Sequence, residues 1–355
     1  MDHKQMTKKI RLENKFIGMD YPCFIIAEAG VNHNGNVKIA KKLIDEAKKA
    51  GADAIKFQTF RTEDLVTRNT RMARYQKKNL GTQENSQFEM LKRLELSHEN
   101  FMDLKDHCRK RRTIFLSTAH SENEIDFLDT IVGAHKIASG DLTNIPFLQK
   151  IAKTLKPMIL STGMGTMKEI REAIDSIKQA GNDKIAVLHC TTNYPCPLNE
   201  VNLRAMLSIQ EETGLIVGYS DHTEGINTSV LAAAMGAKII EKHFTLDKGM
   251  RGPDHKASIE TEELARMVIA IRETEMILGN GIKTPTRSEK VISAAARKSV
   301  IAKVNIPKGK MITAKMLIIK RPGTGIRPGK IHEVIGKIAR RNIIADNLIK
   351  WNQIR

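Results

Sequence analysis

Polar and ionisable side chains recur along the chain, each at or just after the end of a short apolar run. In order they are Glu28; Lys56 and Gln58; Ser117 and Thr118; Lys136 and Ser139; Ser161; His189; Ser220 and His222; and Glu241 and His243. Any one of them fits a hydrogen-bonded residue of a protein core. Eight such run ends in one chain are hard to explain by packing alone, so they predict a catalytic or binding site if the runs converge.

Two lysines and two serines of this set have the chemistry of a phosphate site. The ammonium groups of Lys56 and Lys136 supply positive charge. The hydroxyl groups of Ser139 and Ser161 supply directed hydrogen-bond donors. The four residues therefore predict that the site holds a phosphate group.

Two histidines in the set suit a metal ion. His222 and His243 follow neighbouring runs, and each has a carboxylate residue close in sequence, Asp221 and Glu241. Two imidazoles with room for water suit a divalent transition metal with open coordination positions. One histidine alone would more often be a buried structural residue, but a pair favours metal binding. Glu28 is then a candidate acid, base or partner of metal-bound water.

The apolar runs themselves predict eight β-strands. Their expected ranges are 24–27, 54–57, 113–117, 135–138, 158–161, 185–189, 215–219 and 238–241. Helical patterns separate most of them, at 37–50 and around 88–111, and most clearly at 168–180 and 262–278. Strands that alternate with helices predict a parallel sheet. Eight units in roughly 250 residues predict a (β/α)8 barrel, in which catalytic groups lie at the carboxyl ends of the strands.

The alternative to a barrel is a doubly wound open sheet. That fold has fewer strands and normally carries a glycine-rich phosphate loop after the first strand, which this chain lacks. One long, polar and basic connection, residues 61–87, would lie on the catalytic face of a barrel, as a lid or as a solvated loop.

The charge of the chain is concentrated in its last part. The whole chain carries 58 Lys and Arg against 40 Asp and Glu, and residues 281–355 hold 18 of the basic but only 3 of the acidic residues. This asymmetry suggests that the tail meets something anionic. Nucleic acid is not the expected partner, because Trp351 is the only aromatic residue in the tail and interleaved aromatic residues are missing.

Composition limits the remaining classes of protein. With 41% hydrophobic and 28% charged residues, the chain has the composition of a globular protein rather than a disordered one. Its 4 cysteines are too few for a disulfide scaffold. No apolar run is long enough for a signal peptide or a membrane span, so a cytoplasmic protein without a membrane partner is expected.

Seven motifs together resemble the sialic acid synthase family, which includes legionaminic and pseudaminic acid synthases. They are IAEAGVNHNG (26–35), AIKFQTF (54–60), LSTGM (160–164), LHCTTNYP (188–195), YSDHT (219–223), EKHFTLD (241–247) and GPDHKAS (252–258). In the tail, KRPGTGI (320–326) resembles the signature of the family's antifreeze-like, or SAF, domain. The resemblance extends from about residue 16 to the end of the chain.

The resemblance implies a TIM-barrel domain over residues 1–280 with an N-terminal extension at 1–20. A linker at 281–296 and a small, mostly-β antifreeze-like domain at 297–355 would follow. The implied reaction condenses phosphoenolpyruvate with an N-acylated amino sugar to give a nine-carbon 2-keto acid and phosphate. The first interpretation is an N-acetylneuraminate synthase acting on N-acetylmannosamine. The alternative is a legionaminic or other nonulosonic acid synthase acting on a 2,4-diacetamido-trideoxy hexose.

The resemblance also implies roles for individual residues. Catalytic roles fall to Glu28, His222 and His243, and the two histidines would hold Mn²⁺, with Mg²⁺ or Co²⁺ as alternatives. Phosphoenolpyruvate would be bound by Lys56, Thr118, Lys136, Ser139, Ser161, Asn193 and Ser220. The sugar would be bound by Gln58, Tyr194, Asp254 and, from the partner subunit of a domain-swapped homodimer, Arg321.

Two departures from the family's usual motifs stand out. The family commonly has Pro-Phe after Ser-Thr, whereas this chain has Ala119 and His120, a change that could reshape the sugar pocket. The amide of Asn193 is shifted by one position relative to some members. A more distant alternative is a non-catalytic protein that binds sugar or nucleic acid through residues 297–355.

Overall fold

The computed structural model describes residues 9–81 and 86–355. The chain folds into two compact units, and the division between them falls after Gly279. In the part of the chain that the structure describes, no helix is both long and apolar enough to cross a membrane.

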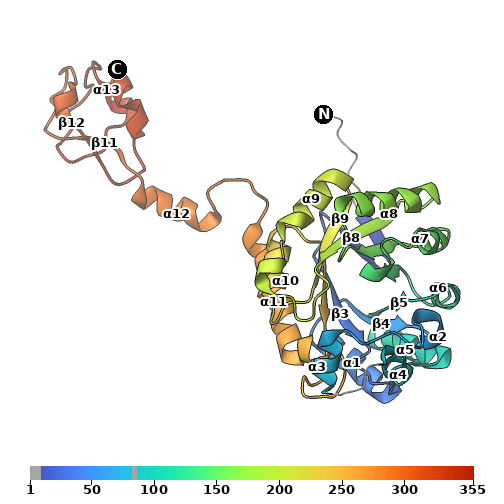
Figure 1. The fold of residues 1–355 in the computed structure, drawn as a ribbon. Helices are drawn as coiled ribbons and strands as arrows, with labels where there is room; N and C mark the ends of the chain where they lie inside the picture. The colour runs from blue at the N-terminus through green and yellow to red at the C-terminus, as the bar shows by residue number, and fades with distance from the viewer. Residues whose placement is uncertain (1–8, 82–85) are drawn as a thin grey trace. The chain divides into compact units, whose positions relative to one another are not determined.

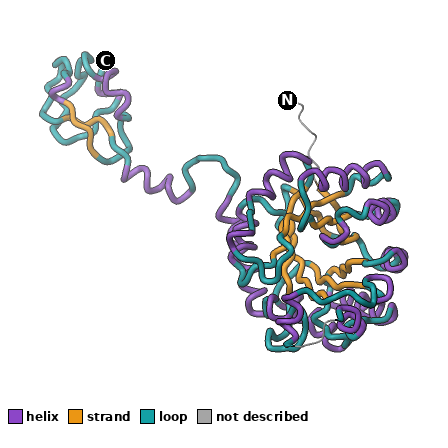
Figure 2. The backbone as a smooth tube through the Cα atoms, viewed as in Figure 1, coloured by secondary structure: helices purple, strands orange, loops and turns teal. Residues whose placement is uncertain are grey.

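The first unit is a closed barrel of eight parallel strands (Figures 1 and 2). Its strands are β3 (Phe24–Gly30), β4 (Ala54–Thr59), β5 (Ile114–Ala119), β6 (His135–Ile137), β7 (Met158–Ser161), β8 (Ile185–Cys190), β9 (Ile216–Asp221) and β10 (Ile239–His243). The barrel closes where β10 pairs with β3. The predicted (β/α)8 fold is confirmed. The main difference in strand bounds is β3, which continues to Gly30 and so includes Glu28.

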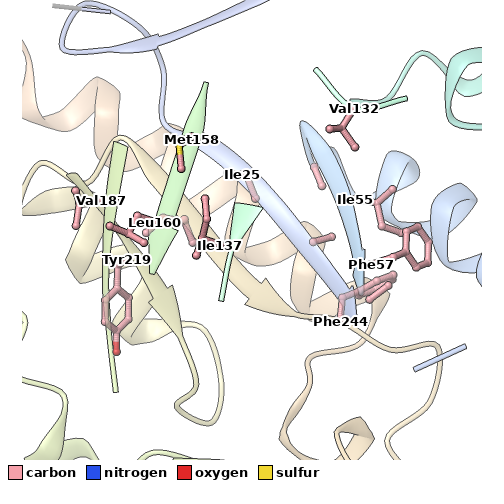
Figure 3. Packing of buried hydrophobic residues seen from close by; sticks show 14 of the residues in the cluster. Ile25, Ile55, Phe57, Val132, Ile137, Met158, Leu160, Val187, Tyr219 and Phe244 are labelled. Carbon is pink, nitrogen blue, oxygen red and sulfur yellow. The ribbon is translucent and has the colours of Figure 1, made fainter. Parts of the chain in front are cut away.

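Helices surround the barrel (Figure 1). They are α1 (Val37–Lys49), α5 (His98–Arg111), α6 (Glu122–Asp129), α7 (Ile145–Ala152), α8 (Met167–Gln179), α9 (Arg204–Thr213), α10 (Asn227–Ala234) and α11 (Thr261–Leu278). Their apolar faces pack on outward-facing strand residues such as Ile55, Leu160 and Tyr219, which Figure 3 shows in the buried cluster. This packing leaves the inward-facing positions of the strands for the barrel interior.

The single helix expected at 88–111 is wrong, because the structure has two helices there. They are α4 (Gln87–Lys92) and α5, which begins after Ser97. The Ser97 hydroxyl accepts from the backbone N–H of Asn100, and the Asn100 side chain accepts from the backbone N–H of Ser97. This reciprocal cap fixes a helix start in the middle of the predicted segment.

Part of the long connection after β4 packs against a small apolar cluster. It contains α2 (Thr62–Leu65) and α3 (Arg74–Leu80), while residues 82–85 of the predicted lid or loop lie outside the described residues. Phe60 and Met72 pack with Met90, Leu91 and neighbouring residues in a small buried cluster. Within the described parts of the connection, Thr62, Met72 and Gln76 are buried, while many of the other residues are exposed.

A hairpin that the sequence did not predict closes one end of the barrel. Strands β1 (Lys9–Leu12) and β2 (Lys15–Gly18) pair antiparallel within the region expected only as an extension. Ile10, Leu12 and Ile17 pack with residues at the starts of barrel strands, including Phe24 and Ile239. The amino-terminal end of the barrel is thus filled with apolar side chains, and the site lies at the other end.

The second unit has a small core of its own. Helix α12 (Arg287–Ala296), which lies in the region expected as a linker, precedes the antiparallel strands β11 (Ser299–Ala302) and β12 (Leu317–Lys320) and the short helix α13 (Ile331–Val334). Val300, Ile312 and Ile349 are among its fully buried residues. The predicted small domain, low in helix, is confirmed.

Candidate active site

The carboxyl ends of all eight barrel strands surround one cavity of about 200 Å³. Its lining residues are Glu28, Lys56, Gln58, Thr118, His120, Lys136, Ala138, Ser139, Gly140, Ser161, Thr192, Tyr194, Ser220, His222, Glu241 and His243. Pairs two positions apart, such as Lys56 with Gln58 and Glu241 with His243, enter together because alternate residues of a strand face the same side. The cavity therefore collects most of the polar residues singled out in the sequence.

Two lysines and two glutamates form a buried cluster at this cavity. The Lys56 Nζ lies 2.9 Å from Oε2 of Glu28 and 3.8 Å from Oε2 of Glu241. The Lys136 Nζ lies 3.6 Å from Oε1 of Glu241. Burying a charge is costly unless it is paired, and here each lysine has a carboxyl group within 4 Å. The carboxyl groups keep the two ammonium groups in place inside the cavity. An anion that binds there can replace a carboxyl group as the partner of these ammonium groups.

Hydroxyl groups extend this cluster. The Lys136 ammonium donates to the Ser161 hydroxyl at 2.6 Å, and the Lys56 ammonium donates to the Thr118 hydroxyl at 3.3 Å. The Ser220 hydroxyl donates to Glu241 at 3.1 Å. Together these groups offer several donors within one small space, which is the chemistry that a phosphate or carboxylate needs.

A glycine lets the loop after β7 approach the cavity closely. The backbone N–H of Gly163 donates to the Ser139 hydroxyl at 3.0 Å. A Cβ at this position would collide with the Thr192 hydroxyl and lie 2.8 Å from the Ser139 hydroxyl. Only glycine therefore fits here without displacing a residue that lines the cavity.

Glu28 is poised to exchange a proton near neutral pH. Burial raises the pKa of Glu28 to about 7, and the negative charge of Glu241 acts in the same direction, while the Lys56 ammonium opposes both. The Gln58 amide donates to the other carboxylate oxygen of Glu28 at 3.3 Å. A carboxyl group with such a pKa in a cavity suits general acid–base chemistry.

The two histidines lie side by side with a tyrosine. The ring centroids of His222 and His243 are 5.5 Å apart, and the Tyr194 ring lies 4.2 Å from His222 and 5.5 Å from His243. The Nδ1 of His222 donates to the carbonyl oxygen of Thr191 at 2.7 Å, which leaves its Nε2 as the acceptor nitrogen. The buried Nδ1 of His243 has no hydrogen-bond partner among the described residues.

These two imidazoles fit a divalent metal ion. Burial lowers the pKa of His222 and holds the pKa of His243 well below its usual value, so both rings are neutral and carry a free lone pair. Within residues 9–81 and 86–355, no group of three or more His, Cys, Asp or Glu side chains is arranged to hold a metal. A metal held here would thus have two protein ligands and open positions for water or substrate.

A second buried ion pair lies directly behind the histidines. Lys242 and Asp221 are fully buried and 3.0 Å apart. The two oxygens of Asp221 also accept from the backbone and hydroxyl of Thr223 and from the Ser229 hydroxyl. Lys242 precedes His243 and Asp221 precedes His222 in the sequence, so the pair ties together the strand ends that carry both imidazoles.

Two residues to which the resemblance gave a role, Asn193 and Asp254, do not line the cavity, and a third, Arg321, lies in the second unit. Asn193 is exposed and does not line it, because its neighbours Thr192 and Tyr194 take the inward positions. Asp254 is buried in the loop after β10, where its carbonyl accepts from the Ser258 hydroxyl. Arg321 belongs to the second unit, where its Nε donates to the carbonyl of Ala296 at 3.1 Å.

Two further polar residues at strand ends serve the fold instead of the cavity. His189 is half-buried, and its Nε2 donates to the carbonyl of Val201 at 2.8 Å. Ser117 is likewise bonded to the Thr59 hydroxyl.

The sequence did not assign a substrate, metal or catalytic role to three polar residues that line the cavity, Glu241, His120 and Thr192. The position of Glu241 at the cavity could have been predicted from the sequence. It lies two residues before His243 on the same strand, so both side chains face the same side.

The barrel, its buried lysine–glutamate cluster and its histidine pair define a (β/α)8-barrel enzyme whose site is built to hold an anion. The model of the NeuB family matches residues 43–283, and that of the SAF domain matches residues 297–355. The chain therefore belongs to the NeuB family, which confirms the resemblance found in the sequence.

Relatives and solved structures agree with this assignment. The N,N'-diacetyllegionaminic acid synthase of Legionella pneumophila subsp. pneumophila is 46% identical over 95% of this chain and 96% of its own length. The N-acetylneuraminate-9-phosphate synthase of Homo sapiens is 36% identical over 91% of this chain and 90% of its own. The crystal structure of an N-acetylneuraminic acid synthetase from Leptospira borgpetersenii, 35% identical, covers 82% of this chain and 96% of its own with a TM-score of 0.73. The chain is thus an enzyme of the same synthase class.

Proposed function

We propose that the protein is a nonulosonic acid synthase that condenses phosphoenolpyruvate with a 2,4-diacetamido-trideoxy hexose, as a legionaminic acid synthase does. The observation that carries the choice of acceptor is the 46% identity to a legionaminic acid synthase, against 36% to an N-acetylneuraminate-9-phosphate synthase. The first interpretation of the sequence, an N-acetylneuraminate synthase acting on N-acetylmannosamine, is the second candidate and receives less support.

The buried cluster supports binding of phosphoenolpyruvate. Lys56 and Lys136 bind its anionic groups, and the hydroxyls of Ser161 and Thr118, already paired with these lysines, add donors. The substrate is then held with its C3 free to attack the aldehyde carbon of the open-chain sugar. Binding between fixed, water-excluded charges makes these contacts stronger than they would be in water.

The reaction also needs one water molecule and the movement of its protons. C3 of phosphoenolpyruvate forms the new C–C bond with the aldehyde carbon, and the aldehyde oxygen becomes a hydroxyl. Water adds at C2, and the C–O bond to phosphate breaks as the 2-keto group forms. The two protons of water finish on the new hydroxyl and on phosphate, and Glu28, with its pKa near neutral, is the group that takes up and returns a proton.

His222 and His243 would hold the metal that the resemblance implies, Mn²⁺ first and Mg²⁺ or Co²⁺ as alternatives. A divalent ion there would supply Lewis-acid polarisation of the sugar's aldehyde oxygen. The residues' own contribution is to present neutral imidazoles, of which His222 is oriented by the Thr191 carbonyl.

We also propose a cytoplasmic homodimer in which Arg321 of one subunit reaches the sugar bound by the other. Basic side chains beside Arg321 support this role, since Lys320, Arg341 and Lys350 line the same cleft of about 590 Å³ in the second unit. Replacing Arg321 by Ala should raise the KM for the acceptor sugar and leave the KM for phosphoenolpyruvate unchanged.

Phosphate release tests the proposed reaction. Phosphoenolpyruvate and Mn²⁺ are mixed with the enzyme and with one of three acceptors: the diacetamido-trideoxy hexose, N-acetylmannosamine or its 6-phosphate. Fastest release with the diacetamido sugar, lost on chelation, is the expected result. Faster release with N-acetylmannosamine would restore the first interpretation, and no release with any acceptor would contradict the proposed reaction.

A further inference from the structure

Among the polar residues that line the cavity, His120 is one without a role in the mechanism above. His120 lies at the carboxyl end of β5, two positions beyond Thr118 and on the same side of the strand, and it lines the cavity together with Lys56 and Lys136. Its backbone N–H donates to the carbonyl of Thr59 at 3.2 Å, which ties it to β4. The residue is thus held at the rim of the lysine cluster.

The imidazole ring is fixed on one side by an apolar neighbour. The Phe60 ring meets it edge to face, with 6.2 Å between ring centroids. Phe60 is itself buried in the cluster with Met72, Met90 and Leu91. Phe60, which does not line the cavity, thus packs against the ring of His120.

The Nε2 atom of His120 is buried and has no hydrogen-bond partner among the described residues. A buried polar atom without a partner costs stability, so such atoms in folded proteins usually have a reason to be there. The family that this chain resembles commonly has phenylalanine at this position. Phenylalanine would fill the space without burying an unpaired polar atom. A ligand that pairs with Nε2 would explain the histidine.

The surroundings select the kind of ligand. Burial, together with the nearby ammonium groups of Lys56 and Lys136, lowers the pKa of His120 to about 4. The ring is therefore neutral, and one of its nitrogens carries a hydrogen that it can donate. Because His120 lines the same cavity as Lys56 and Lys136, an anion bound by the two lysines is the partner that this donor can reach.

We propose that His120 is a further substrate-binding residue, whose Nε2–H donates to an oxyanion of the phosphoenolpyruvate held by Lys56 and Lys136. This inference rests on the proposed function, because it takes phosphoenolpyruvate as the anion. The contact would help to place the phosphoryl or the carboxylate end of the substrate, in addition to Thr118 on the same strand.

Calorimetric titration of the full-length protein, without acceptor sugar, tests this contact. Phosphoenolpyruvate, inorganic phosphate and pyruvate are each titrated into the wild type and into H120F, H120L and H120Q. The matched control is H107Q, since His107 lies on α5 away from the cavity and pairs with Asp45. Far-UV circular dichroism and thermal unfolding show which variants are folded, and H120L replaces H120F if the latter does not fold.

The expected result is that H120F or H120L weakens binding of phosphoenolpyruvate by roughly tenfold or more, as loss of a hydrogen bond to a charged group does. H120Q, which keeps an N–H donor, should recover much of the affinity, and H107Q should match the wild type. A parallel loss with phosphate assigns the contact to the phosphoryl end, and a loss with pyruvate alone assigns it to the carboxylate.

Unchanged binding of phosphoenolpyruvate by folded H120F and H120L would overturn the proposal, as would a change confined to the KM for the acceptor sugar. A wild type that binds inorganic phosphate but not phosphoenolpyruvate would instead contradict the proposed function. The phosphate titration would then still decide whether His120 contacts an anion.

Discussion

Glu28 and Lys56 are register partners on the neighbouring strands β3 and β4, and their charged ends lie 2.9 Å apart in the buried cavity. The pairing matters because the carboxylate and the ammonium group have different tasks in the proposed reaction. The lysine holds an anion, and the glutamate exchanges a proton. When substrate takes the ammonium group, the carboxylate loses its closest positive partner and becomes a stronger base.

Replacing Glu28 by Gln should therefore remove turnover, while a side chain of nearly the same size still occupies this position in the cavity. We expect the kcat of phosphate release to fall by about 10²–10⁴-fold, the usual contribution of a positioned acid or base. Binding of phosphoenolpyruvate should persist, since both lysines remain. Activity within a few-fold of the wild type would remove Glu28 from the chemistry.

The histidine pair should control metal binding and activity together. We expect His222→Ala and His243→Ala each to weaken Mn²⁺ binding, followed by electron paramagnetic resonance of the free ion, and to abolish phosphate release. Adding a chelator should abolish phosphate release by the wild type, and removing the chelator and restoring Mn²⁺ should recover it. The control is His332→Gln on the exposed surface of the second unit, which should behave as the wild type. Full Mn²⁺ affinity in both alanine variants would show that the metal is held elsewhere.

Acid should destabilise the barrel through its buried neutral histidines. Burial, with a contribution from nearby His255, lowers the pKa of His33 from 6.5 to about 4. Between pH 6.5 and pH 4 the unfolded chain therefore binds more protons at this residue than the folded chain does. The stability that the neutral ring contributes is complete above pH 6.5 and is lost as the pH falls toward 4.

Urea unfolding at pH 7.0, 5.5 and 4.5 measures this effect. The wild type should lose stability on acidification, and His33→Asn should lose less of it over the same range, because asparagine does not titrate. An equal pH dependence in the wild type and in H33N would exclude His33 as a source of the acid sensitivity.

The sequence predicted the barrel because each of its strands is an apolar run that ends in polar residues. It did not predict the hairpin of β1 and β2. The segments Lys9–Leu12 and Lys15–Gly18 have only four residues each, in which charged and apolar residues are mixed. The reason for their apolar residues is visible only in the structure, where these side chains pack against the barrel interior. The break before α5 was readable, since Ser97 is a good helix cap. The outward position of Asn193 was not predictable, because motif order alone does not say which residues of a turn face inward.

The hairpin contributes stability rather than chemistry. Leu12 is fully buried against the barrel interior, so Leu12→Ala should lower the free energy of unfolding by about 2–5 kcal/mol. The KM for phosphoenolpyruvate should not change at a temperature where the variant is folded. A large rise in KM with unchanged stability would mean that the hairpin influences the far end of the barrel.

The buried pair of Asp221 and Lys242 should link stability to metal binding. Lys242 donates to the Thr223 carbonyl at 2.5 Å as well as to Asp221, and Asp221 accepts from the Ser229 hydroxyl at 2.6 Å. Removing one partner leaves a buried charge uncompensated, so Lys242→Met should cost about 3–5 kcal/mol in the free energy of unfolding.

The double variant D221N/K242M should recover part of that loss, because it buries no unpaired charge. Its Mn²⁺ affinity should nevertheless stay about 10–100-fold below that of the wild type, as is usual when residues that orient metal ligands are lost. Stability and metal affinity that recover together in the double variant would mean that the pair only supports the fold. Recovery of stability alone would mean that it holds His222 and His243 in the arrangement that binds the metal.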